Sequence, residues 1–219
     1  MTKRCPYLSY EKLECCPLTE CPCLKCELRN LKSECGSFTD PRDSRTYRTI
    51  KIGEQVWMAE NLAFDYAGSY CYENNTELAN KYGRLYSWYT AMKAAPPGWH
   101  LPTEHEWHKL IKSVGGTPVT DAMLLCGNGC DTYYDKIRSY MYTGNVLQAG
   151  KGDEFGFSML PCGHRHPDGT FKELHYEGYI WTASECRDAE QARYLKYKTL
   201  ASACGVSKSY GLSVRLVKD

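Results

Sequence analysis

The sequence has no apolar run long enough to span a membrane and no strong excess of charge of either sign. Lys and Arg number 27 against 26 Asp and Glu, which gives a formal net charge of +1. This balance argues against a protein that binds nucleic acids or membranes through bulk electrostatics. We therefore expect no membrane span and no specific nucleic-acid partner.

Signals for targeting and for repeated architecture are missing as well. The stretch MTKRCPYLSYEKLECC has neither an apolar h-region nor a small-residue cleavage site, so no secretory signal is visible. We expect a cytoplasmic or phage-associated protein. The sequence also lacks internal repeats and the glycine-rich phosphate loops of α/β nucleotide-binding proteins.

Cysteine, by contrast, is abundant and unevenly distributed, with 13 residues in the chain. Seven lie in the first 35 residues, namely Cys5, Cys15, Cys16, Cys21, Cys23, Cys26 and Cys35. The other six are scattered: Cys71, Cys126, Cys130, Cys162, Cys186 and Cys204. This change in composition predicts a boundary near Gly36–Ser37, between a cysteine-rich segment (1–36) and a larger domain (37–219).

The cysteine-rich segment contains too little Leu, Ile and Val to bury a core of its own, so we expect a covalent or metal staple. Cys23-x2-Cys26 has the spacing that lets two thiolates reach one tetrahedral ion. A second pair comes from Cys5 with Cys16, or with Cys15 instead. The predicted ligands of a structural zinc ion are therefore Cys5, Cys16, Cys23 and Cys26. Disulfides, an iron–sulfur cluster and free thiols stay open as alternatives, and the segment is also a candidate for docking onto a larger assembly.

The larger domain shows mostly strand patterns. IKIGEQVWMAENL alternates around a break at Gly53–Glu54, which predicts a hairpin. YGRLYSWYTAMKA begins like a strand and continues with helical spacing at Trp88, Ala91, Met92 and Ala95. RYLKYKT and YGLSVRLVKD alternate like strands and are joined by small residues at 200–207. We expect an α+β fold, loop-rich, with antiparallel strands and two helices.

The stretch GWHLPTEHEWHKL is either a metal site or a helix start. Thr103 followed by Glu106 fits a capping box, and an apolar stripe at helical spacing follows at Trp107, Leu110, Ile111 and Val114. The H-E-x-x-H spacing of zinc enzymes is absent. We interpret the stretch as a helix start, with His100 in a loop where it bonds the backbone.

FGFSMLPCGHRHPDGTF predicts a second hairpin, with Asp168–Gly169 as its turn. His164 and His166 project to the same side of its first strand. A metal site is one interpretation of this pair, and a surface or rim position is the other.

Several of these motifs occur together in one known family. IKIGEQVWMAENL, YGRLYSWYTAMKAAPPGWHLPTEHEW, the second hairpin, GYIWTASE and YGLSVRLVKD, in this order, resemble the Fibrobacter succinogenes major paralogous domain. That family is similar to the C-type-lectin fold and to formylglycine-generating enzymes. The resemblance covers roughly Ser37 to Asp219 and leaves out the cysteine-rich segment. It implies a compact unit of twisted antiparallel sheets whose terminal strands meet.

The ending also resembles the variable proteins of diversity-generating retroelements, which vary a ligand-binding surface on this fold. Framework positions of that family match Trp181, Ser184, Glu185, Gly211, Ser213, Val214 and Arg215. The residues between them are a mixture that randomised codons or ordinary loop drift would both produce. This resemblance implies a binding surface within residues 179–210.

Three hypotheses follow for the function: an enzyme, a lectin or a displayed binding face. The late cysteines Cys186 and Cys204 do not match the closely spaced pair of formylglycine-generating enzymes, and the calcium motifs of lectins (EPN, QPD, WND) are absent. We expect a non-catalytic protein that binds a protein or carbohydrate ligand. The predicted ligand-binding residues are Tyr179, Trp181, Cys186, Arg187, Arg193, Lys196, Lys198, Cys204, Lys208 and Tyr210. For Trp181 a place in the core is an equal alternative, whereas the cations are expected to be exposed and to favour an acidic or polar ligand.

Overall fold

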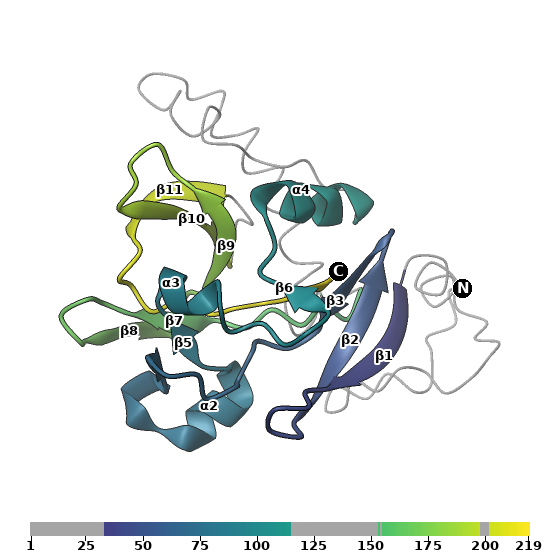
Figure 1. Ribbon diagram of the computed structural model, residues 1–219, viewed down its shortest axis with the longest axis horizontal. Coiled ribbons are helices and arrows are strands. Elements are labelled where there is room, and N and C mark those ends of the chain that lie inside the picture. Colours follow the sequence, from purple (N-terminus) through teal and green to yellow (C-terminus); the bar gives the residue numbers. More distant parts are fainter. Residues whose placement is uncertain (1–32, 115–152, 154, 198–201) are drawn as a thin grey trace, which may run out of the picture.

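The computed structural model describes residues 33–114, 153, 155–197 and 202–219 (Figure 1). Its largest sheet has five strands in the order β1-β2-β3-β12-β6. Their bounds are β1 Ser33–Thr39, β2 Thr46–Ile52, β3 Gln55–Met58, β12 Val217–Lys218 and β6 Trp99–His100. The last strand of the chain, β12, therefore pairs between β3 and β6, beside the strands that open the described region. The first and last strands, β1 and β12, thus belong to one sheet, but β2 and β3 lie between them, so they do not meet as the resemblance implied.

The β2–β3 hairpin confirms the break expected at Gly53–Glu54. Ile52 pairs with Gln55, so Gly53 and Glu54 alone form the loop. Gly53 has a φ of 61°, a left-handed conformation that suits a tight two-residue hairpin. The β1 strand, in contrast, crosses the boundary expected at Gly36–Ser37, because its pairing with β2 already begins at Ser33. The sheet thus incorporates the end of the cysteine-rich segment.

Three smaller antiparallel sheets complete the strand structure. One has the order β11-β10-β9, with β9 at Tyr179–Glu185, β10 at Gln191–Lys196 and β11 at Ser202–Ser207. The others pair β4 (Ser69–Tyr70) with β5 (Leu85–Tyr86) and β7 (Cys162–Arg165) with β8 (Phe171–Leu174). The β7–β8 hairpin confirms the predicted turn. The strand β11 lies within the small-residue connection expected at 200–207 and pairs with β10.

The helix α4 (Glu104–Ser113) follows the predicted capping box. The hydroxyl of Thr103 accepts a bond from the backbone N–H of Glu106, and the Glu106 carboxylate accepts one from the N–H of Thr103. Trp107, Leu110 and Ile111 are buried on one side of the helix. The stretch GWHLPTEHEWHKL therefore contains a helix start, as predicted, which follows the short strand β6. In Figure 1, α4 lies between the five-stranded sheet and the β9–β11 sheet.

The other helical segments are short. A 3-10 turn, η1 (Tyr72–Asn74), precedes α2 (Thr76–Tyr82), which was not anticipated and which Asn75 caps with its side chain. The expected helix after Tyr86 is only α3 (Trp88–Ala91), and Met92 at its end is 45% exposed rather than part of an inward stripe. The described residues thus hold three α-helices where we expected two.

Two apolar clusters fill the interior on the two sides of β9 and β10. Ile180 and Leu195 join the cluster under α4, whereas Trp181 and Ala192 join the cluster that includes α3. Because side chains alternate across a strand, each of these two strands contributes to both clusters. Strands β9 and β10 are therefore packed against apolar residues on both of their faces.

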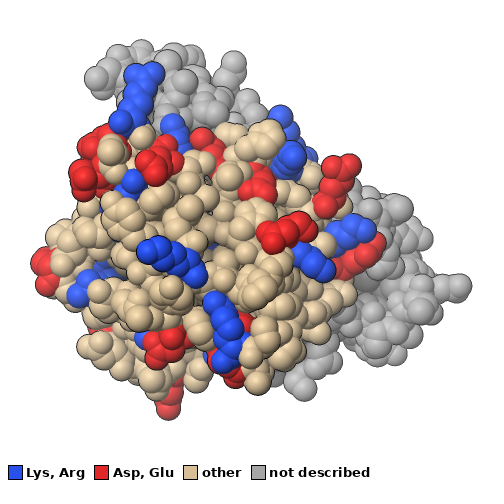
Figure 2. Space-filling view, viewed as in Figure 1, with Lys and Arg blue, Asp and Glu red and all other residues tan. Residues whose placement is uncertain are grey.

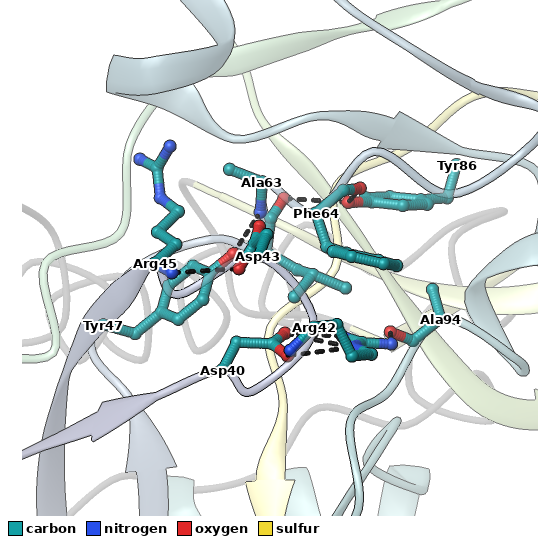
Figure 3. A network of polar contacts seen from close by, with 10 residues as sticks. Asp40, Arg42, Asp43, Arg45, Tyr47, Ala63, Phe64, Tyr86 and Ala94 are labelled. Atoms are coloured by element: carbon teal, nitrogen blue, oxygen red, sulfur yellow. Dashed lines mark hydrogen bonds and ion pairs between the residues drawn. The ribbon is translucent and has the colours of Figure 1, made fainter.

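A buried ion pair fixes the β1–β2 turn to the rest of the domain (Figure 3). Asp40 is fully buried and accepts bonds from the guanidinium of Arg42, the shortest at 2.6 Å. Arg42 also donates to the carbonyl of Ala94 and stacks on the ring of Phe64 at 3.8 Å. Burial alone would raise the pKa of Asp40, but the bonds and charge of Arg42 outweigh it and lower that pKa.

The architecture is therefore α+β, strand-rich and loop-rich, with several antiparallel sheets. Among the described helices, none has the length and apolar character needed to cross a membrane.

Candidate ligand-binding face

Trp181 belongs to the core, which corrects its place among the predicted ligand-binding residues. Its side chain is 0% exposed, and its indole N–H donates to the carbonyl of Tyr86 at 2.7 Å. A buried indole needs such an acceptor, and β5 supplies it. Trp181 therefore supports the sheet from beneath and does not reach a ligand.

Lys208 is also buried, although we expected it to be exposed. Its ammonium lies 4.3 Å from the ring centre of Trp88 and 5.5 Å from that of Tyr89. It also forms an ion pair with Glu185 at 3.3 Å. A buried ammonium requires a counter-charge and polarisable neighbours, and this site provides both. Lys208 thus connects the chain after β11 to α3.

Arg193 points toward α4. Its guanidinium donates to the carboxylate of Glu104 at 3.1 Å, and its own carbonyl accepts a bond from the hydroxyl of Thr182. Two of the cations that suggested an acidic ligand are therefore engaged with carboxylates of this chain.

The remaining predicted residues are spread over the end of the small sheet. Cys186, which is disulfide-bonded, and Arg187 lie in the β9–β10 turn. Glu185, Asp188 and Glu190 in and beside this turn are exposed. Figure 2 shows acidic side chains gathered at the upper left of the face in view. Cys204 lies in β11, whereas Lys198 and the predicted zinc ligands Cys5, Cys16, Cys23 and Cys26 lie outside the described residues.

Tyr179 and Tyr210 are brought together with histidines from another hairpin. The ring centre of His164 lies 5.1 Å from that of Tyr179 and 5.8 Å from that of Tyr210. His166 contacts Tyr210 at 5.0 Å, and Tyr194 contacts Tyr179 at 5.7 Å. All five side chains are partly exposed. We call this set, His164, His166, Tyr179, Tyr194 and Tyr210, the tyrosine–histidine face.

The backbone that assembles this face links β7 to the segment after β11. Gly211 and Arg165 exchange two backbone hydrogen bonds, each 2.8 Å long. Ser213 donates its N–H to the carbonyl of Tyr179 at 3.0 Å. Because Tyr210 directly precedes Gly211, its ring is placed against the histidines of β7.

Glu173 on β8 reaches the same face through an unusual backbone conformation. Its φ is 65°, and Gly163 on the paired strand has a φ of 64°. The Glu173 carboxylate accepts a hydrogen bond from the Tyr179 hydroxyl at 2.5 Å and lies 3.5 Å from Nδ1 of His164. A Cβ on Gly163 would lie 2.5 Å from the carbonyl oxygen of Lys172. Glycine is therefore required where β7 and β8 approach each other closely.

The ionisable groups of the face respond to these contacts. Burial lowers the pKa of His164 more than the neighbouring Glu173 raises it, so the ring is neutral at pH 7. Burial, and then the bond to Glu173, raise the pKa of Tyr179, which keeps its hydroxyl protonated. The backbone N–H of Thr170 is the main cause that lowers the pKa of Asp168 to about 2. The ammonium of Lys196 lies 5.9 Å from the Tyr179 ring centre.

This arrangement offers ring surfaces, hydroxyls and carboxylate oxygens, which are groups for recognition. The nearby thiol of Cys162 is fully buried and accepts a bond from the Ser213 hydroxyl at 3.0 Å. Burial raises the pKa of that thiol, so it stays protonated and unreactive. Within the described parts of the chain, no three His, Cys, Asp or Glu side chains are grouped closely enough to hold a metal ion.

His100 has a different role from the one expected. It bonds two carboxylates rather than the backbone: Asp219 lies 2.6 Å from Nδ1 and Glu106 lies 2.7 Å from Nε2. His108 lies 3.9 Å from Glu104 on the same helix. These histidines therefore belong to the packing around α4.

Sequence reasoning missed Tyr194, Glu173 and the histidines as members of one face. The alternation of His164 and His166 indicated that the two rings share one side of the strand, but it did not indicate which residues they contact. They contact Tyr210, which the pairing of Arg165 with Gly211 brings to them.

Comparison with known proteins gives a family. Residues 50–218 match the family described as Fibrobacter succinogenes major domain. No curated protein and no solved structure matches the chain. Because the match covers most of the sequence, the chain belongs to the Fibrobacter succinogenes major domain family.

Proposed function

We propose that the protein is a non-catalytic ligand-binding protein that presents the tyrosine–histidine face on a C-type-lectin-like scaffold. The observation that carries the proposal is the packing of the partly exposed Tyr179 and Tyr210 rings against His164 and His166. The rings of Tyr179, Tyr194 and Tyr210 pack against the buried cluster that contains Trp181, which is fully buried. A rigid base with exposed aromatic groups favours recognition.

Ring-to-ring contacts preorganise the face. Tyr179 is held by Tyr194, His164 and the carboxylate of Glu173, so it loses little conformational freedom when a ligand binds. Tyrosine rings have few rotatable bonds and carry both an apolar surface and a hydroxyl group. Such side chains give affinity at a low entropic cost.

The ligand we propose is not strongly acidic, which revises the expectation from the sequence. Arg193 and Lys208 form ion pairs with Glu104 and Glu185. The face itself is bordered by Glu173 and Asp168, which are 44% and 55% exposed. These carboxylates offset the cations near the face, Lys172 and Lys196, so the face carries no strong excess of positive charge that would select an acidic ligand.

We also propose that residues on this sheet are diversified, as in variable proteins of retroelements. The support is the separation between buried framework and solvent: Ser213, Val214 and Arg215 are fully buried, whereas Arg187 is exposed and Lys196 is partly exposed. Sequencing the 3′ end of this gene in a population tests the idea. Differences confined to adenines of an adjacent template copy support it, and an invariant end without a template indicates a fixed binding module.

For the cysteine-rich segment we propose a structural zinc ion, with disulfides as the alternative, and a role in docking onto a larger assembly. Metal analysis of the purified full chain, together with titration of its free thiols, separates zinc from disulfides. Removal of residues 1–32 should abolish association and preserve the fold.

Binding through the face is tested with arrays of oligosaccharides and peptides probed by the full chain. We expect Tyr210→Ala to lose the ligand that the wild type retains. Tyr89→Ala is the matched control, because Tyr89 is 53% exposed on α3 and lies outside the face. Equal loss in both variants would contradict the proposal.

A further inference from the structure

The geometry points to a neutral carbohydrate as the ligand of the tyrosine–histidine face. This inference rests on the proposed function and names the class of molecule that the face binds. It is carried by aromatic rings and carboxylate acceptors that meet on one surface.

The ring surfaces suit the apolar side of a sugar. Tyr179, Tyr194 and Tyr210 are each partly exposed, and their partners hold them at fixed angles: Tyr179 is tilted 58° to Tyr194 and perpendicular to His164. A pyranose ring presents C–H groups on one side, and these pack on an aromatic surface. Its hydroxyl groups point outward from the same ring and need polar partners nearby.

Glu173 supplies such a partner. Its Oε2 atom accepts the bond from Tyr179 and lies near His164. Among the described residues, no hydrogen bond is formed by its other oxygen, Oε1, and the side chain is 44% exposed. An ionised carboxylate accepts several hydrogen bonds and donates none, so it pairs with hydroxyl donors.

Asp168 adds a second acceptor at the end of the same hairpin. Its Oδ1 accepts bonds from the N–H and the hydroxyl of Thr170, and its Oδ2 lies 2.9 Å from Nδ1 of His166. These bonds fix the carboxylate while leaving it more than half exposed. Two fixed acceptors beside ring surfaces can orient a polyhydroxylated ligand.

The backbone conformation of Glu173 supports a binding role for its carboxylate. A φ of 65° is strained for a residue with a side chain, and glycine would adopt it freely. The strain directs the carboxylate at Tyr179 and His164. Positions that keep such strain with a polar side chain are commonly part of binding sites.

The same observations disfavour other ligand classes. An anionic ligand would meet the carboxylates of Glu173 and Asp168. Protein interfaces centre on large anchors that protrude into the partner. The rings of the face are only partly exposed, and the large apolar side chains that are exposed in the described parts of the chain, Tyr89, Met92 and Tyr176, lie outside it.

The test is calorimetric titration of the full chain with neutral oligosaccharides of glucose, xylose and mannose, with oligogalacturonate as the charged counterpart. We expect at least one neutral oligosaccharide to bind. Glu173→Gln should weaken it roughly tenfold or more through loss of a charged acceptor. Tyr179→Phe, which keeps the ring, should weaken it less than Tyr210→Ala, and Tyr89→Ala should leave it unchanged. Circular dichroism and melting temperature verify that each variant folds, and Glu173→Gln keeps the test valid if Tyr210→Ala does not.

Three results would overturn the inference. If no neutral oligosaccharide binds while a peptide from the array binds and is lost in Tyr210→Ala, the ligand class is wrong and the proposed function stands. If sugars bind with equal affinity to the wild type and all face variants, the face is not their site. If no ligand of either class responds to any face variant, the proposed function fails as well.

Discussion

His100 and Asp219 are 119 residues apart in the sequence, yet Nδ1 of the imidazole and Oδ1 of the carboxylate are separated by 2.6 Å. Glu106 at the start of α4 bonds the other ring nitrogen. The imidazole therefore joins the residue after β12 to both β6 and α4. This contact fixes the end of β12 to its neighbour β6 in the five-stranded sheet.

The His100 contact should make stability depend on pH. Burial by itself lowers the pKa of His100, but the bonds to Asp219 and Glu106 outweigh it and raise that pKa. The stabilisation is therefore fully present below the unfolded pKa of about 6.5 and is lost as pH rises through the higher folded pKa. We expect His100→Gln to lower the free energy of unfolding by about 0.5–1 kcal/mol near pH 6, since the ring is partly exposed. The difference should shrink near pH 9.

Melting temperatures of both proteins across this pH range measure the effect. His105→Gln is the control, because His105 is exposed on the same helix. On the acid side the contribution of Glu106 sets the limit: its pKa is lowered, so its stabilisation is present above the unfolded pKa and lost as pH falls through the folded value. A difference between wild type and His100→Gln that does not vary with pH would contradict the account.

Gly163→Ala should disrupt the tyrosine–histidine face. The new Cβ would lie 2.5 Å from the carbonyl oxygen of Lys172 and 2.8 Å from the nitrogen of Leu174. We expect a loss of about 3 kcal/mol or more in the free energy of unfolding. Gly98→Ala is the matched control, because its φ is also positive but nothing lies within 4 Å, and it should cost only about 1 kcal/mol. Equal losses of stability for both variants in urea denaturation would contradict the close approach of β7 and β8 at Gly163.

Arg215→Lys should be strongly destabilising. The guanidinium of Arg215 is fully buried and donates to Asn61 Oδ1, with distances of 3.0 and 2.8 Å, and to the Phe157 carbonyl. Burial lowers its pKa to about 10, yet it stays charged at pH 7. A lysine cannot reproduce this fork, so we expect a loss of about 3 kcal/mol in chemical denaturation. Arg48→Lys, at a half-exposed ion pair, should change stability by less than about 0.5 kcal/mol, and a similar effect in both would be evidence against a structural role for Arg215.

Thr103→Ala should cost about 1 kcal/mol of stability, because it removes the hydroxyl of the capping box. Thr76→Ala provides the comparison: Thr76 opens α2 and is exposed, but Asn75 performs the capping there. Thermal unfolding of both variants is the measurement. A drop of the same size for Thr76→Ala would mean that the box contributes nothing specific.

Local signals in the sequence predicted local structure well. The capping box at Thr103, the hairpin at Gly53 and the turn at Asp168 each depend on neighbours within a few residues, and each is present. The family could be recognised from contiguous motifs as well. Structure that depends only on neighbouring residues can be predicted directly from their order.

The candidate site could not be predicted to the same extent. It depends on a pairing between Arg165 and Gly211 that brings Tyr210 to the histidines. The prediction that Lys208 is exposed was wrong. Its stretch is polar, but Trp88 and Glu185, which are distant in the sequence, bury and neutralise the ammonium. Contacts between distant segments, and the charges they cancel, cannot be deduced from spacing alone.

The central claim is that ligands bind at the tyrosine–histidine face. Isotope-labelled tyrosine rings, followed by NMR while an array-selected ligand is added to the full chain, test it most directly. The account predicts shifts of the Tyr179, Tyr194 and Tyr210 signals, with those of the exposed Tyr89 unchanged. Shifts at Tyr89 with the three face tyrosines unmoved would contradict it.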